Sequence, residues 1–206
     1  MGESGAGRAG LSHAGWSGLH HGIDPARVPF LRAWLRVVYR VARPLRAVPP
    51  MAFTVLGAVL AVDALLLAST QPWVALVLVL VSAACDALDG AVAVIAQRAS
   101  AAGAVADKVA DRVADTAFAL VIWRCGAPLW LAACAAVLSL LHEAIREIRG
   151  GRLRSRVTVA ERPTRVICAA LACLCAGVSS AAWPPTVCAA VWVALAVVGL
   201  AQLARV

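Results

Sequence analysis

Six apolar segments dominate this sequence, and each is long enough to cross a lipid bilayer as a helix. A spanning helix needs about 20 mostly apolar residues. Apolar residues make up 62% of the 206 residues, which is more than a soluble domain of this size uses. The sequence therefore predicts an all-α polytopic membrane protein. Its six expected transmembrane helices are Met51–Ser69, Trp73–Ile95, Gly103–Trp123, Pro128–Ile148, Ala160–Ala181 and Pro185–Ala204.

Two segments of different character precede the first expected span. Residues 1–24 are rich in Gly, Ser, His and Ala and have no continuous apolar stretch, so we expect a disordered arm rather than a signal peptide. Residues 25–47 combine apolar residues on one helical face with arginines every four residues on the other. Such a basic amphipathic helix lies in the membrane interface beside anionic lipids. We assign residues 48–206 to one six-helix membrane domain.

The distribution of basic residues predicts how this domain is oriented. The connections near Thr70–Pro72 and Trp183–Pro184 contain no Lys or Arg, and the turn after the third span contains only Arg124. Every other basic residue falls in the arm, in the remaining connections, or at span ends beside them. The positive-inside rule then places both termini in the cytoplasm. The preference for Arg over Lys and the many alanines suggest a bacterial cytoplasmic membrane. Nucleic-acid binding is not expected despite the formal charge of +8, because the arginines flank membrane spans.

Four carboxylates lie at or beside the ends of the second and third spans. Asp86 and Asp89 are three residues apart, and Asp107 and Asp111 are four apart, so each pair shares one face of a helix. If the two helices are neighbours, all four carboxylates converge. Four like charges that close cannot all stay ionised without cations between them. Hard divalent cations that prefer oxygen ligands, Mg²⁺ or Mn²⁺, meet this requirement.

The stretch that contains these acids, DALDGAVAVIAQRASAAGAVADKVAD, resembles the signature of the CDP-alcohol phosphatidyltransferase family. Seven of the eight signature positions match at the right spacing. The exception is Val94, where the family usually has an arginine that offers positive charge to the donor phosphates. Arg98 lies four residues further on and is a candidate substitute. The matching positions are Asp86, Asp89, Gly90, Ala93, Gly103, Asp107 and Asp111.

The resemblance implies an integral membrane enzyme of phospholipid synthesis. Its members move a substituted phosphate from a CDP-linked lipid donor, usually CDP-diacylglycerol, to a small alcohol acceptor and release CMP. It implies that Asp86, Asp89 and Asp107 are metal ligands, and that Asp111 is mainly the general base although it can also reach a metal. It also implies a homodimer as one expected assembly. The residues assigned to the nucleotide pocket are Gly90, Ala93 and Gly103, with Arg98.

A second basic region, residues 146–165, joins the fourth and fifth spans on the expected cytoplasmic side. Arginine binds phosphate with a planar fork of donors, so this region could hold a phosphate of the acceptor alcohol. It could equally be an orientation signal that contacts lipid headgroups. The arginines considered for the acceptor are Arg146, Arg154, Arg156, Arg162 and Arg165.

Two further acids lie inside expected spans, and two other classes of function stay open. Asp115 extends the face of Asp107 and Asp111 by one turn, and we expect it to pair with an arginine. Asp63 is compatible with a structural or a substrate-facing role. The alternatives are a catalytically divergent or inactive family member, motivated by Val94, and an ion-binding transport protein, since buried acids also mark ion pathways. The acids gather at one side of the membrane rather than at its midplane, which speaks against transport.

Overall fold

The computed structural model describes residues 29–98, 100–149 and 158–205, with side chains from residue 36 onward, and all regular elements in these ranges are helical. The elements are α2 (Pro29–Ala42), the short 3₁₀ helix η2 (Pro44–Ala47), α3 (Pro50–Leu67), α4 (Pro72–Ile95), α5 (Ala101–Arg124), α6 (Leu129–Arg149), α8 (Arg162–Val178) and α9 (Trp183–Ala204). The predicted all-α class is confirmed for this part of the chain.

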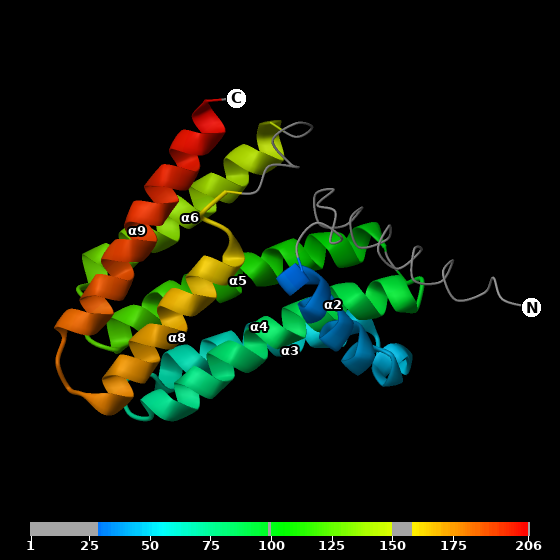
Figure 1. Cartoon of the computed structure of the whole chain (residues 1–206), viewed down its shortest axis with the longest axis horizontal. Coiled ribbons are helices and arrows are strands. Elements are labelled where there is room, and N and C mark those ends of the chain that lie inside the picture. Colours follow the sequence, from blue (N-terminus) through cyan, green and yellow to red (C-terminus); the bar gives the residue numbers. More distant parts are fainter. Residues whose placement is uncertain (1–28, 99, 150–157, 206) are drawn as a thin grey trace, which may run out of the picture.

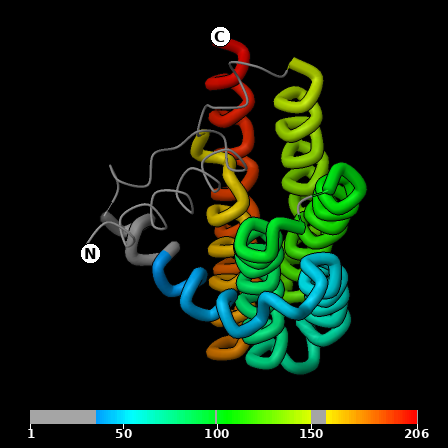
Figure 2. The backbone as a smooth tube through the Cα atoms, turned by 90° about the vertical axis from the view of Figure 1, so that its right-hand side faces the viewer, coloured from blue at the N-terminus to red at the C-terminus, as the bar shows by residue number. Residues whose placement is uncertain are grey.

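Helices α5 and α8 occupy the middle of the bundle. Helix α3 packs against α4 and α5, while α8 packs against α4, α5 and α9. Figure 1 shows α6 and α9 as a neighbouring pair on one side of α5 and α8, with α3 and α4 on the other. Helix α2 lies across the other helices (Figure 2), and its Val38 and Ala42 pack against Ala91 and Val92 of α4. Helices that are distant in sequence therefore bring their side chains to one shared interior.

Proline and turn residues explain where the helices begin. Proline occupies the first turn of α3, α4, α8 and α9, where its missing N–H costs no intrahelical hydrogen bond. Helix α5 is capped instead by Ser100, whose hydroxyl oxygen accepts a hydrogen bond from the Gly103 N–H at 3.0 Å. The tight turn from α5 to α6 contains Gly126 at φ 117°, a conformation that a side chain would strain.

Small side chains let the helices approach closely. Alanines supply most of the buried core, and Trp192, Phe118 and Ile122 are among its few large members. A Cβ atom at Gly57 of α3 would lie 3.3 Å from the Cβ of Cys85 on α4. The Ser82 hydroxyl donates to the Gly57 carbonyl at 2.7 Å across the same contact. Such close helix packing by small residues is typical of membrane bundles.

Four of the described helices are long and apolar enough to cross a membrane, namely α3, α4, α6 and α9. The prediction of six spans is therefore supported for four of them. Helix α5 begins with a stretch that contains Asp107, Lys108, Asp111, Arg112 and Asp115, and α8 has only 17 residues. All six expected spans are nevertheless helices with bounds within four residues of the expected ones.

The expected amphipathic segment at 25–47 is described from residue 29 and consists of α2 followed by η2. Arg36 and Arg40 are exposed, whereas Val38 is buried against the bundle. The expected disordered arm at 1–24 lies outside the described residues.

Candidate active site

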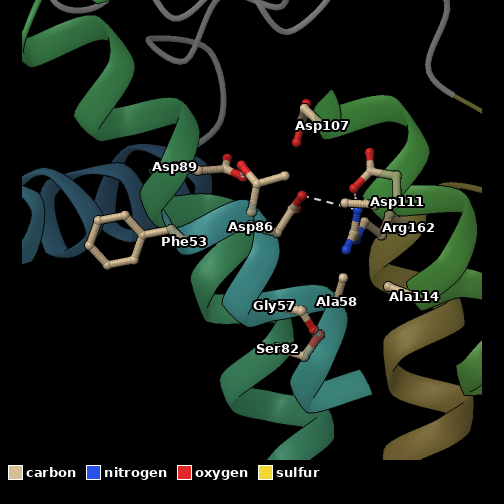
Figure 3. Close-up of a pocket in the computed structure, with 12 residues that line it drawn as sticks. Phe53, Gly57, Ala58, Ser82, Asp86, Asp89, Asp107, Asp111, Ala114 and Arg162 are labelled. Carbon is tan, nitrogen blue, oxygen red and sulfur yellow. Dashed lines mark hydrogen bonds and ion pairs between the residues drawn. The ribbon is translucent and has the colours of Figure 1, made fainter. Parts of the chain in front are cut away.

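Three carboxylates from two helices meet at one end of the bundle. Asp86 and Asp89 lie one turn apart on α4, and Asp107 lies near the start of α5. Each offers one oxygen atom, and these three atoms all lie within 4.8 Å of one another. Figure 3 shows the three side chains pointing toward a common space from the two helices. The convergence that the spacing predicts is thus present for Asp86, Asp89 and Asp107.

Helix α3 contacts this group through a hydrogen bond to Asp89. Asp89 is 7% exposed, and its Oδ2 accepts a hydrogen bond from the Thr54 hydroxyl at 2.8 Å. Thr54 can reach Asp89 because Gly57 and Ser82 allow α3 and α4 to pack closely one turn deeper. A hydrogen bond to one carboxylate oxygen fixes the orientation of the group and leaves the other oxygen for a ligand.

Asp111, the fourth carboxylate, contacts an arginine instead of joining the other three. Arg162 in the first turn of α8 uses Nη1 to contact the Asp111 carboxylate. The same Nη1 lies 3.0 Å from Oδ1 of Asp86. Arg162 therefore connects α8 to both α4 and α5 at the edge of the three-carboxylate group (Figure 3).

A pocket opens where these helices meet. Of the described residues that line it, four are acidic and one, Arg162, is basic, so the wall carries net negative charge. The remaining lining residues are small or apolar apart from two hydroxyls. The described residues that line the pocket are Phe53, Thr54, Gly57, Ala58, Ser82, Asp86, Asp89, Asp107, Ala110, Asp111, Ala114 and Arg162.

A buried ion-pair network lies beneath the pocket. Arg165, 2% exposed, contacts the Asp115 carboxylate and donates to Glu143 of α6 at 2.8 Å. It also donates to the Ala160 carbonyl at 2.9 Å. Arg112 adds a longer pair with Glu143 at 3.7 Å. The network ties α5, α6 and α8 together, and it shows the arginine pairing that we expected for Asp115.

The arginines considered for an acceptor phosphate lie in different environments. Arg162 lines the pocket, whereas Arg165 is held by Asp115 and Glu143. Arg146 is buried and pairs with Glu161 at 2.9 Å. Arg154 and Arg156 lie outside the described residues. Of the three candidate arginines that the structure describes, Arg162 is the one that lies at the group of Asp86, Asp89 and Asp107.

The residues expected to form the nucleotide pocket lie beside the carboxylates rather than among the described residues that line the acidic pocket. Gly90 and Ala93 follow Asp89 on the last turns of α4, where Val94 also lies. Arg98 is exposed in the connection to α5, just after Gln97 at φ 52°. Gly103 lies in the first turn of α5 and takes part in its cap.

Sequence reasoning missed the contributions of α3 to the site. Thr54 is a single hydroxyl within an otherwise apolar run, and only the packing of α3 on α4 identifies Asp89 as its partner. Ser82, one turn before Asp86 on α4, acts through the Gly57 carbonyl and aligns the two helices. A lone hydroxyl in an expected span is a weak signal, since most such hydroxyls bond to their own helix.

The donor set suits a hard divalent cation. The three carboxylates offer oxygen atoms alone, which are the ligands that Mg²⁺ and Mn²⁺ prefer. Asp89 is nearly buried beside two other acids, an arrangement that is costly unless positive charge accompanies it. The residues present therefore fit such an ion.

Comparison with known proteins gives one match. The sequence model described as CDP-alcohol phosphatidyltransferase matches residues 47–202, which includes every helix from α3 to α8 and most of α9. No curated protein matches the chain, and no solved structure does.

Proposed function

The chain belongs to the CDP-alcohol phosphatidyltransferase family, and on this premise we propose that it transfers a phosphatidyl or other substituted phosphate group from a CDP-linked lipid to a small alcohol. The family supports phosphatidyl transfer in general terms. The proposal adds CDP-diacylglycerol as the usual donor, CMP as the released product, and dependence on Mg²⁺ or Mn²⁺. The observation that carries it is the convergence of Asp86, Asp89 and Asp107 from two helices.

The proposed reaction exchanges one phosphorus–oxygen bond for another. The acceptor hydroxyl oxygen bonds to the phosphorus that carries the lipid, and the bond from that phosphorus to the CMP oxygen breaks. A divalent ion held by Asp86, Asp89 and Asp107 would neutralise charge on the diphosphate of the donor. The proton of the acceptor hydroxyl passes to the carboxylate of Asp111, which we assign as general base.

Other residues of the chain would bind and orient the substrates. Gly90, Ala93 and Gly103 leave room for a nucleotide near the backbone, and Arg98 is the proposed substitute for the arginine that Val94 replaces. Arg162 is the basic side chain nearest to the reacting groups among the described residues that line the pocket. The buried hydrogen bond from the Thr54 hydroxyl would hold Asp89 in place. We propose a cytoplasmic acceptor site in a bacterial membrane, with both termini on the same side.

The test is an assay of the purified protein in lipid vesicles. CDP-diacylglycerol and Mg²⁺ or Mn²⁺ are supplied with a panel of alcohols that includes glycerol phosphate and an inositol phosphate. We expect CMP release that requires both the metal and one alcohol, with a matching lipid product. The Asp107→Asn variant should release no CMP, because it lacks one of the three carboxylates. A wild type that turns over no CDP-linked donor would support the inactive alternative.

A further inference from the structure

The contacts of Arg162 set it apart from the other arginines of this region. It is placed by the first turn of α8, three residues before Arg165. On the facing helix α5, Asp111 lies four residues before Asp115. The two helices are therefore joined by two successive ion pairs, Arg162 with Asp111 and Arg165 with Asp115. These two pairs differ in burial and in the number of hydrogen bonds that each arginine makes.

The deeper pair is fixed. The side chains of Arg165 and Asp115 are 2% and 3% exposed, and Arg165 also bonds to Glu143 and to the Ala160 carbonyl. Breaking one member of such a buried pair leaves an uncompensated charge. These contacts hold the start of α8 against α5 even when the contacts of Arg162 in the pocket change.

The upper pair is held by fewer bonds. The side chains of Arg162 and Asp111 are 20% and 28% exposed. Arg162 uses the single atom Nη1 for both Asp86 and Asp111, and its Nε has no hydrogen-bond partner within the described residues. A paired fork of two nitrogens on one carboxylate would be stronger. The guanidinium of Arg162 is therefore held less firmly than that of Arg165.

Asp86 belongs to two groups at once. It contributes an oxygen to the group with Asp89 and Asp107, and it also lies 3.0 Å from Nη1 of Arg162. A divalent ion at the three carboxylates and the guanidinium would compete for the same side chain. The ion would also repel the guanidinium, because both are positive and only one carboxylate separates them. The contact of Arg162 with Asp111 would then weaken as well.

We infer that Arg162 is the counter-cation of this site. Its guanidinium binds Asp86 and Asp111 until a divalent ion binds to the three carboxylates. The ion then displaces the guanidinium and leaves the Asp111 carboxylate open. The inference rests on the proposed function and adds an order of events to it. Metal binding makes the general base available. Without the ion, Arg162 neutralises part of the acidic wall and keeps Asp111 occupied. Metal binding is coupled to the availability of Asp111 through two side chains, Asp86 and Arg162.

The first test measures Mn²⁺ binding to the purified protein in detergent by electron paramagnetic resonance of the free ion. Replacement of Arg162 by glutamine removes the competitor, so we expect Arg162→Gln to bind Mn²⁺ about fivefold more tightly, the factor that corresponds to about 1 kcal/mol. The matched control is Arg149→Gln, which removes the same charge from the last turn of α6 outside the pocket. It should leave Mn²⁺ affinity unchanged. Equal or weaker binding by Arg162→Gln overturns the inference.

The second test separates release of the side chain from a general effect of its charge. Phenylglyoxal modifies accessible arginines, and peptide mass spectrometry reports the extent at each one. We expect Mg²⁺ to raise modification of Arg162 in the wild type and to have no such effect in Asp107→Asn. Constant or reduced modification of Arg162 on Mg²⁺ addition overturns the inference.

The two failures are distinguishable. If neither the wild type nor Arg162→Gln binds Mn²⁺, the proposed metal-dependent function fails and the inference fails with it. If Mn²⁺ binds normally while the Arg162 contacts prove insensitive to metal, only the inference fails and the proposed function stands.

Discussion

The aspartates of the pocket differ in burial and in the side chains that they contact. Asp89 is nearly buried and accepts a hydrogen bond from Thr54, whereas Asp111 is partly exposed and contacts Arg162. A carboxylate that binds an ion benefits from a fixed orientation, while one that accepts a proton must be able to reach the substrate. The contacts of Asp89 suit the first task and the position of Asp111 suits the second.

Asp111→Asn should separate these two tasks. The amide keeps the shape of the side chain but cannot accept the proton, so we expect kcat for CMP release to fall about 10²–10⁴-fold. Mn²⁺ binding should persist, because the three-carboxylate group is intact. Asp63→Asn makes the same chemical change in α3 outside the pocket and serves as the control. Loss of Mn²⁺ binding in Asp111→Asn would make Asp111 a metal ligand instead of the base.

Thr54→Val should weaken metal binding without removing a ligand. Valine has the size of threonine but leaves Oδ2 of Asp89 without its 2.8 Å hydrogen bond. Loss of a hydrogen bond that orients a ligand commonly lowers metal affinity about tenfold or more, and we expect a decrease of that order in Mn²⁺ titrations. Thr54→Ser should restore affinity. Thr116→Val removes a hydroxyl that bonds within α5, to the Arg112 carbonyl, and should change nothing. Equal affinities for Thr54→Val and the wild type would contradict the orienting role.

At the scale of helices, sequence spacing predicts which residues share a face but not which faces meet. The three-residue step from Asp86 to Asp89 predicted a shared face, because it depends on local helix geometry alone. Their meeting with Asp107 followed only on the condition that the second and third spans are neighbours. The sequence could not predict which of the five candidate arginines reaches the carboxylate pocket. The outcome depends on how α8 packs against α5, which brings Arg162 to Asp111 and Arg165 to Asp115. The contact between Thr54 and Asp89 depends in the same way on the approach of α3 to α4.

The buried pair between α5 and α8 predicts a large effect on stability. Arg165→Met leaves Asp115 and Glu143 without their buried partner, and we expect the free energy of unfolding in detergent to fall by about 3 kcal/mol or more. The control is Lys108→Met, which breaks the exposed pair with Glu147, where both side chains are nearly half exposed. That change should cost about 1 kcal/mol or less. Equal effects of the two substitutions would show that the buried network does not hold the helices together.

The whole bundle raises the question of how many helices cross the membrane. Only α3, α4, α6 and α9 meet the requirements of length and composition among the described helices. Helix α5 has 24 residues and is about 36 Å long, enough to span a bilayer, but its first half is charged. Its acids face Arg162, Arg165 and the pocket rather than an apolar surface. The buried residues of α5 begin at Ala114, and its Asp111 and Asp115 pair with arginines. Such pairing allows a charged helix to span, because its polar groups meet each other instead of lipid.

The location of the turn after α5 tests whether α5 crosses the membrane. With both termini in the cytoplasm, as the distribution of basic residues predicts, a crossing by α5 would place the turn that contains Gly126 on the opposite side of the membrane. If α5 does not cross, the same turn is cytoplasmic. We expect alkaline phosphatase fused after Gly126 to be active in a bacterial host and green fluorescent protein at the same position to be dark. Fusions at the C-terminus should show the reverse. A phosphatase that is inactive after Gly126 would show that α5 does not cross the membrane.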